Sequence, residues 1–406
     1  MNKKILIIGY VWPEPKSSAA GRRMMQLIQF FKAEKYQVHF ATPCAKSEHS
    51  FPLHTIDVET SSIALNNTSF DDFIKEFDPS VVLFDRFMME EQFGWRAQEG
   101  CPNAVTILDT EDLHSLRKKR KRVLTGKKNN SKDDELELRE LASIYRCDLS
   151  LIISQVEMAY LADKGIPDLQ LLYLPFMETI PNETEFKSFD SRSNFVTIGT
   201  FLHEPNVDGI RYLKSEVWPL VRRKLPKVEM HIYGSYPNSK VEQLTNAKEG
   251  FFIKGWADSS TEVMSNSRLC LSPLRFGAGL KGKFVDAMRN GTPSITTFIG
   301  SEGMELNVDW PGFVSDSPVE LADMAVELYL NSSLWEQKQK LCKPALELLF
   351  SKEVYFSILQ ERLNAVEKNL PTLRISNTIG AILKLNTLRS TKYMSKWIEE
   401  KNKNQE

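Results

Sequence analysis

Short apolar runs alternate with longer segments of helical periodicity along most of the chain, and this alternation limits the possible folds most strongly. In the first half the runs are rich in Ile, Val and Leu and lie at residues 5–9, 38–43, 80–85, 104–109 and 149–154. Runs of this kind are typical of parallel strands that are buried on both faces. Between the first two runs, Met24, Leu27, Ile28 and Phe31 recur at the spacing of a helix that crosses over a sheet. The first half is therefore predicted to be a doubly wound α/β domain.

A second α/β series begins near residue 194. Its strands are expected at residues 194–200, 228–234, 250–255, 269–274 and 294–297. Residues 176–193 are polar and turn-rich, which indicates a linker. A chain of 406 residues also exceeds what one hydrophobic core usually covers. We expect domains at 1–180 and 190–350, followed by helices over 351–406 that pack back toward the first domain.

Composition excludes several function classes. The 52 Lys and Arg residues balance 53 Asp and Glu residues, so no overall field favours nucleic acid as a partner. The five cysteines are far apart and form no C-x-x-C pair, which argues against a disulfide framework or a zinc site. The apolar run at 5–9 leads into prolines and not into a signal-peptide cleavage site, and no run is long enough to span a membrane. A cytoplasmic protein is expected, with at most a peripheral contact at the inner face of the membrane.

The segment from Leu271 to Met304 carries the most chemical information. Gly277, Gly279 and Gly282 allow a tight turn and a close approach to a ligand, and Lys281 and Lys283 stand where a helix begins. The free N–H groups and the dipole of a helix N-terminus favour an anion, so the segment predicts a diphosphate site.

Asp286 follows Lys283 by three residues and so lies on the same helix face, where a carboxylate can accept both hydroxyls of a ribose. A surface ion pair beside glycines that merely close a turn explains the same pattern. A P-loop is rejected because Phe284 stands where a Ser or Thr would ligate magnesium. A Rossmann dinucleotide site is rejected because Gly9 is followed by Tyr-Val-Trp-Pro.

The same segment resembles the donor-site signature of glycosyltransferase family 4, in which a glycine loop precedes an E-A-M-type helix and G-x-P. Here the helix reads Asp286-Ala287-Met288 and the following turn reads Gly291-Thr292-Pro293. The stretch IGTFLHEPNVDGIRYLKSEVWPLV and the pairs Tyr233-Gly234 and Gly255-Trp256 also resemble that family. The resemblance implies an α/β protein of the GT-B fold, with two Rossmann-like doubly wound domains that face each other across a cleft.

Donor-site roles follow from this resemblance. Asp286 would hold the donor ribose, Lys281 or Lys283 the diphosphate, and the backbone near Trp256 the nucleobase, while the loop that contains Glu302 would lie near the donor. The donor site would also include Gly199, Thr200, Gly277 and Gly279.

The sequence departs from the family pattern at three of these positions. Ala278 replaces the first of two spaced carboxylates, Thr200 replaces a phosphate-binding Arg, and Asp286 is shorter than the usual second carboxylate. Two lysines would then replace one Arg.

The first domain offers two loops for the acceptor side. Ser18, Ala20, Gly21 and Arg22 resemble the family's loop beneath the donor phosphates, although a plain strand-to-helix turn accounts for them equally well.

The second loop is residues 109–114, at the carboxyl end of a predicted strand, where α/β ligand sites form. We predict His114 first and Asp112 second as the group that accepts or orients the acceptor proton, and Asp85 as a weaker candidate. A loop histidine and a helix-capping aspartate are the alternative.

Two further segments leave alternatives open. The basic run at 117–128 either docks onto anionic lipid or forms a solvated face that is balanced by the acidic residues after it. Residues 372–406 form either an amphipathic surface helix or an ordinary helix packed on the body.

The sequence predicts a glycosyltransferase that moves a sugar from a nucleoside-diphosphate sugar to a saccharide or lipid-linked acceptor. No D-x-D motif occurs, so neither a metal nor any other cofactor is expected. The resemblance implies retention at the sugar carbon and a role in making cell-surface polysaccharide or glycoconjugate. A sugar-nucleotide epimerase of GT-B fold and a non-catalytic GT-B binding protein are the alternatives.

Overall fold

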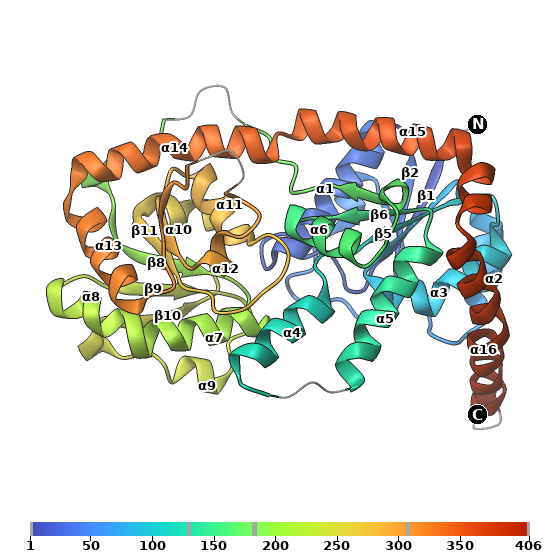
Figure 1. Ribbon diagram of the computed structural model, residues 1–406, viewed down its shortest axis with the longest axis horizontal. Helices are drawn as coiled ribbons and strands as arrows, with labels where there is room; N and C mark the ends of the chain where they lie inside the picture. The colour runs from blue at the N-terminus through green and yellow to red at the C-terminus, as the bar shows by residue number, and fades with distance from the viewer. Residues whose placement is uncertain (1–2, 128–130, 181–184, 306–308, 404–406) are drawn as a thin grey trace.

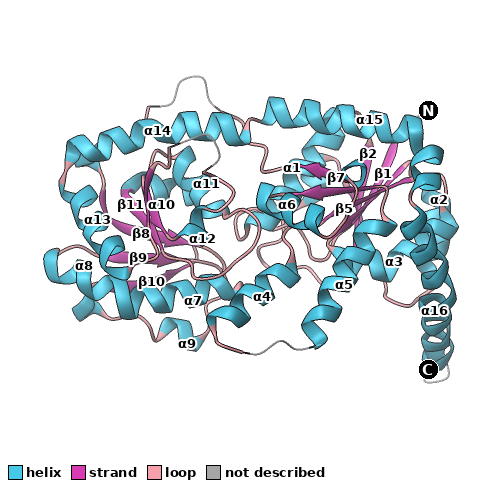
Figure 2. Cartoon of the chain, in the orientation of Figure 1, coloured by secondary structure: helices cyan, strands magenta, loops and turns pink. Residues whose placement is uncertain are grey.

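The computed structural model contains two parallel β-sheets, each covered by helices on both faces (Figures 1 and 2). It describes residues 3–127, 131–180, 185–305 and 309–403. The two sheets belong to successive halves of the chain, and three long helices at the C-terminal end run along both halves. The predicted two-domain α/β architecture is thereby confirmed.

The first sheet has the strand order β3-β2-β1-β4-β5-β6-β7, with every pair parallel. Its strands are β1 (Lys4–Ile8), β2 (Gln37–Thr42), β3 (Glu59–Ser62), β4 (Val81–Asp85), β5 (Val105–Asp109), β6 (Leu149–Ile152) and β7 (Leu171–Tyr173). Its helices are α1 (Ala19–Ala33), α2 (Ser69–Phe77), α3 (Phe87–Gly100), α4 (His114–Leu124), α5 (Ser131–Arg146) and α6 (Gln155–Asp163). All residues of β4 and β6 are buried, as continuous apolar runs predict.

The second sheet has the strand order β10-β9-β8-β11-β12-β13, again parallel throughout. Its strands are β8 (Ser193–Ile198), β9 (Met230–Tyr233), β10 (Phe251–Gly255), β11 (Ser267–Ser272), β12 (Ser294–Thr296) and β13 (Gly312–Val314). Its helices are α7 (Glu204–Tyr212), α8 (Trp218–Lys224), α9 (Ser239–Glu242), α10 (Ser260–Asn266), α11 (Gly282–Arg289), α12 (Phe298–Ser301) and α13 (Pro318–Leu330). A π-helical turn at Leu213–Val217 joins α7 to α8.

The C-terminal helices connect the two halves. Helix α14 (Ser332–Phe350) buries Cys342, Leu346 and Phe350 in the core beside α11. Helix α15 (Lys352–Ser376) instead buries apolar residues in the core of the first domain, among them Leu359 and Leu363. Helix α16 (Thr378–Lys403) then runs along α3 and α5 (Figure 1).

The chain crosses between the domains at two adjacent places. The Glu178 N–H donates to Phe350 O at 2.7 Å, and the Lys352 N–H donates to Glu178 O at 3.0 Å. The linker from the first domain and the α14–α15 junction are therefore hydrogen-bonded to each other, which gives the two domains one shared crossing point.

In the part of the chain that the structure describes, no helix combines the length and the apolar character needed to cross a bilayer.

Candidate functional site

A cavity of about 810 Å³ lies between the domains and is lined by both. Its walls are the loops that follow β1, β4 and β5 on one side and β8 and β11 on the other, at the carboxyl ends of the strands. This is where ligands bind in open α/β sheets. The predicted site residues that line it are Ser18, Ala20, Gly21, Arg22, Asp85, Asp112, His114, Gly199, Thr200, Gly277, Gly279, Lys281, Lys283 and Asp286.

Lys281 and Lys283 bring two buried ammonium groups to the second-domain wall. The Lys281 Nζ donates to Gly279 O at 2.9 Å and lies 3.9 Å from a Glu302 oxygen. The Lys283 Nζ donates to Asn206 Oδ1 at 2.9 Å and to Ser272 Oγ at 3.2 Å, which are uncharged acceptors. Burial lowers the pKa of each lysine to about 8. Since a buried charge is costly without an opposite charge, Lys283 favours an anion in this cavity.

The glycines of this loop permit a close approach between the two domains. Gly279 has a φ of +60°, and a Cβ at this position would lie 2.9 Å from the Asp112 Cβ. A Cβ at Gly282 would lie 2.7 Å from the Ala19 Cβ. The sequence predicted that these glycines make room for a ligand, whereas in the structure their missing side chains also make room for the first domain.

A buried carboxylate ties the two facing loops together. Glu157, in the first turn of α6, accepts the Leu113 N–H and the Gly279 N–H, each at 2.9 Å through Oε1. Burial raises the pKa of Glu157 to about 8, with Asp112 contributing further. Sequence analysis did not single out this residue, because its two partners are brought to it only by the folded chain.

Asp286 is engaged by the first domain. The Arg22 guanidinium pairs with the Asp286 carboxylate and donates to Gly282 O at 3.1 Å. Arg289 lies 3.5 Å from the same carboxylate and also pairs with Glu178. The carboxylate that is predicted to hold a ribose is therefore satisfied by an arginine that also lines the cavity.

Asp112 and His114 lie together at the end of the β5 loop. The His114 Nε2 is 3.6 Å from Asp112 Oδ1, and Asp112 is also paired with Arg117. Burial lowers the pKa of His114 to about 4, although Asp112 opposes this shift. Burial alone would raise the pKa of Asp112, but Arg117 and His114 outweigh it and lower that pKa. At neutral pH His114 is thus a neutral imidazole and Asp112 an ion-paired carboxylate, and both are weak bases.

Glu111, in the same loop, has a different environment. It lines the cavity, its backbone has a φ of +62°, and among the described residues no group donates a hydrogen bond to its carboxylate. Burial raises its pKa to about 8, and Asp109 adds to the shift. A positive φ is uncommon for a residue other than glycine. The sequence placed three acidic residues in this loop but could not tell which of them stays unpaired.

Arg86 is a second cavity residue that sequence analysis missed. It follows β4, has a φ of +70°, and its Nε lies 3.7 Å from the Asp85 carboxylate. Burial raises the pKa of Asp85, and Arg86 and the Tyr10 N–H at 3.0 Å both oppose that shift. Asp85 therefore belongs to the cavity wall, next to a cation that the sequence did not identify.

Trp256 and Glu302 do not line the cavity. The Trp256 ring stacks on His49 of the first domain, with ring centroids 3.9 Å apart. Glu302 accepts two hydrogen bonds from Arg120, at 2.7 and 2.6 Å. Both residues instead contact the first domain, beyond the cavity wall.

The basic run at 117–128 is only partly free in solution. Residues 117–124 belong to α4, from which Arg120 reaches Glu302 and Lys121 pairs with Glu204 of the second domain. The prediction of a solvated, mobile face therefore does not describe these two cations. Lys128, at the end of the run, lies outside the described residues.

Within the described ranges, no group of three or more His, Cys, Asp or Glu side chains is arranged to hold a metal ion.

Comparisons with known proteins agree with this architecture. Residues 192–331 match the family model described as "Glycosyl transferases group 1". An uncharacterized 44.6 kDa protein in the cps region of Klebsiella pneumoniae is 28% identical over 144 residues, which is 34% of this chain and 37% of that protein.

Solved structures show a wider likeness. HepE (Alr3699) of Anabaena has a TM-score of 0.66 at 11% identity, over 89% of this chain and 100% of that one. TarM of S. aureus has a TM-score of 0.58 at 13% identity, over 72% of this chain and 58% of that one. The chain thus spans little more than half of TarM and about a third of the Klebsiella protein. It has the two-domain GT-B fold, and residues 192–331 in its second half are similar to the glycosyl transferases of group 1.

Proposed function

We propose that this protein transfers a sugar from a nucleoside-diphosphate sugar to a saccharide or lipid-linked acceptor. The observation that carries the proposal is Lys283, a buried ammonium on an interdomain cavity whose two hydrogen-bond acceptors are both uncharged. A diphosphate supplies the missing negative charge. Structural neighbours support the ligand class, because HepE was crystallised with UDP-glucose and TarM with UDP and fondaparinux.

The second domain would bind and activate the donor. The ammonium groups of Lys281 and Lys283 and the first N–H groups of α11 neutralise the diphosphate as it leaves, without a metal. Asp286 accepts the ribose hydroxyls once Arg22 has released it, and Arg22 then faces the phosphates. Family resemblance favours retention of configuration at the sugar carbon.

The first domain would present the acceptor. The acceptor oxygen bonds to the sugar carbon on the face from which the diphosphate leaves, so that configuration is retained, and the hydroxyl proton passes to an ionised Glu111. We assign this role to Glu111 in place of His114, because its carboxylate is unpaired and its pKa of about 8 suits proton transfer near neutral pH. The neutral His114 and its neighbour Asp112 would orient the hydroxyl.

The Klebsiella relative is named for a cps region, and this supports a role in making cell-surface polysaccharide or a related glycoconjugate. A lipid-linked acceptor would place the enzyme at the inner face of the membrane. The α4 run could supply such a contact only through its cations that do not pair with the second domain.

A thermal-shift screen against sugar derivatives of UDP, GDP, TDP and CMP tests donor binding, since a ligand that binds the folded state raises the melting temperature. We expect a diphosphate nucleotide to give the largest shift, and Lys283→Met to reduce it. No shift with any of the four would contradict the proposal.

Product analysis then separates transfer from the alternatives. A new glycoside that forms only when an acceptor is present supports the transferase. An altered sugar nucleotide without acceptor would identify an epimerase, and tight nucleotide binding without turnover over a wide acceptor panel would identify a binding protein.

A further inference from the structure

Helix α16 exposes a row of large apolar side chains. Ile379 and Ile382 near its start are 51% and 55% exposed, and Tyr393 and Trp397 near its end are 67% and 60% exposed. At 3.6 residues per turn these four positions fall within a sector of roughly 60°, in which Asn386 separates the two apolar pairs and Glu400 follows Trp397. Single exposed apolar residues are common, but several on one helix face mark an interaction surface.

The opposite face of α16 is the one that holds the helix on the first domain. The Arg96 guanidinium of α3 donates to Ser395 Oγ at 3.0 Å and pairs with Glu399, and Lys392 pairs with Glu99. These contacts fix the orientation of α16, so the apolar row points away from the body.

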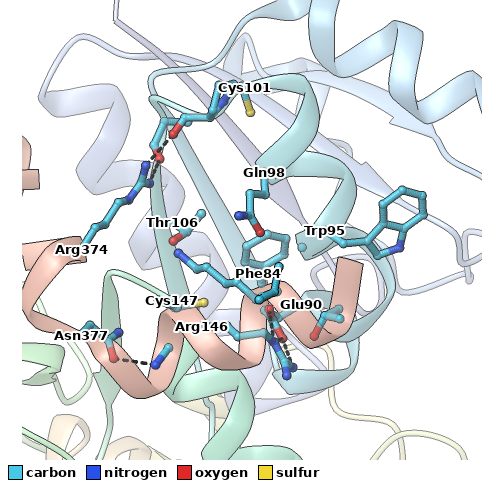
Figure 3. Close-up of a pocket in the computed structure, with 18 residues that line it drawn as sticks. Phe84, Glu90, Trp95, Gln98, Cys101, Thr106, Arg146, Cys147, Arg374 and Asn377 are labelled. Atoms are coloured by element: carbon cyan, nitrogen blue, oxygen red, sulfur yellow. Dashed lines mark hydrogen bonds and ion pairs between the residues drawn. The ribbon is translucent and has the colours of Figure 1, made fainter. Parts of the chain in front are cut away.

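Behind α16 lies a second cavity of about 460 Å³, and Figure 3 shows Arg146 paired with Glu90 and Arg374 hydrogen-bonded to backbone oxygens. Arg146 binds Glu90, and the Arg374 Nε donates to Asp148 at 2.9 Å. Asn377 accepts the Gly380 N–H at 2.8 Å. These polar groups on the inner side are thus bound within the protein, and the exposed apolar side chains of α16 lie on its outer face.

The charge of α16 indicates what would cover this row. The helix contains six Lys or Arg residues and two Glu residues, whereas the whole chain has a net charge of −1. By helical spacing, Lys396 and Lys401 lie on either side of Trp397. A row that contains Trp and Tyr between lysines is typical of helices that lie in the interface of an anionic bilayer.

We infer that α16 docks the protein onto an anionic membrane surface, with its row of Ile379, Ile382, Tyr393 and Trp397 in the interfacial layer. Anionic headgroups are complementary to Lys396 and Lys401, which are exposed beside Trp397, whereas Lys384 and Lys392 pair with carboxylates of the first domain. A second copy of the chain would place two basic helices against each other, where like charges repel. The basic run of α4 differs, because that helix contains no Trp or Tyr.

Vesicle flotation of the full chain tests this inference. One set of vesicles contains phosphatidylcholine alone, and the other contains equal amounts of phosphatidylcholine and phosphatidylglycerol. We expect the protein to float with the anionic vesicles only, and less so at high salt. Trp397→Glu and Ile382→Glu should each weaken binding by about ten-fold or more, because each puts a negative charge into the contact.

Three controls keep the inference falsifiable. Leu330→Glu, at an exposed apolar position of α13, should float like the unchanged protein. Lys118→Ala combined with Lys119→Ala tests α4 and should also leave flotation unchanged. Thermal shift with sugar nucleotides should be the same in Trp397→Glu, so that a loss of docking is separated from a loss of donor binding.

The inference fails if the unchanged protein floats with neither vesicle, or if Trp397→Glu floats as well as it does. It also fails if size-exclusion chromatography shows a dimer that does not float and that Trp397→Glu converts to a monomer. That last result would assign the row to a second copy of the chain.

Discussion

The two walls of the interdomain cavity differ in how the chain builds them. The second-domain wall takes Lys281, Lys283 and Asp286 from one continuous segment at the start of α11. The first-domain wall takes Asp85 and Glu111 from the ends of two neighbouring strands. The residues of the second-domain wall are close together in the sequence, so their relative arrangement can be predicted from it. The residues of the first-domain wall come from separate strands, so the sequence predicts their identities but not their arrangement.

The direction of the pKa shifts also distinguishes the two walls. The second-domain lysines have lowered pKa values and suit a departing anion, while burial raises the pKa of Glu111 and suits proton transfer. Arg22 and Arg120 each cross to a carboxylate on the opposite side. Substitutions on the two walls should therefore lower enzyme activity in different ways.

Glu111→Gln should have the largest effect, a fall in kcat of about 10²–10⁴-fold, because it removes the proposed base. Glu111 acts only when ionised, so the activity of the unchanged enzyme should be lost as pH falls below about 8. The variant's residual activity should lack that pH dependence. Steady-state rates from pH 6 to about 9 check both points.

The pH dependence of stability tests the raised pKa of Glu111 independently of enzyme activity. The pKa of Glu111 is raised in the folded state, so the folded protein retains a proton that the unfolded chain releases, and stability falls as pH rises from about 4.5 to about 8. The melting temperature of Glu111→Gln should therefore gain on that of the unchanged protein over this range. Glu242→Gln, at an exposed position, serves as the control, and an equal gain there would refute the assignment.

Lys283→Met should lower kcat/KM by about 10²-fold, because one preorganised charge is lost from the leaving-group site. Unlike Glu111→Gln, it should also weaken nucleotide binding when measured by calorimetry. Lys254→Met, an exposed lysine of the same domain, should change neither quantity. Equal nucleotide affinity in Lys283→Met and Lys254→Met would show that the diphosphate does not bind at this wall.

Asp286→Asn should weaken nucleotide affinity by roughly ten-fold, since one charged acceptor of the ribose hydroxyls becomes a neutral one. Asp323→Asn, at a surface ion pair with Lys224, is the matched control. A nucleoside diphosphate that lacks both ribose hydroxyls should bind the two variants equally. A persistent difference with that ligand would place the Asp286 effect in domain closure through Arg22.

Trp256→Ala should have the smallest effect and change nucleotide affinity by less than about two-fold, because its ring stacks on His49 and not on the cavity. The substitution should instead lower the melting temperature, because the stacking of Trp256 on His49 is lost. A large loss of affinity would show that this side chain holds the nucleobase in a conformation different from the one described.

The sequence predicted the central strands well and the edges poorly. Residues 80–85 and 104–109 correspond to β4 and β5, where buried Val, Ile and Leu leave a clear pattern. By contrast β3 reads Glu-Thr-Ser-Ser at the exposed edge of its sheet, and β13 has three residues. Such strands are held by pairing with a neighbour and not by their own burial, so no local pattern reveals them.

In the candidate site, too, some features could be predicted from the sequence and others could not. Lys281, Lys283 and Asp286, which the sequence predicted at the start of one helix, line the cavity. The pairing of Arg22 with Asp286 joins residues 264 positions apart, and Glu157 joins Leu113 to Gly279. These contacts depend on how two domains meet, which local periodicity does not encode.

The shared crossing point at Glu178 and Ser351 makes the first domain discontinuous in sequence. A fragment that ended at residue 180 would lack α15. It would expose the apolar surface of the first domain on which Leu359, Leu363, Val366 and Leu370 are buried. Dissecting this protein into autonomous halves would thus require the C-terminal segment to be supplied in trans. Such a pair of fragments would allow a complementation assay, in which binding of the C-terminal segment measures how strongly it holds the two domains together.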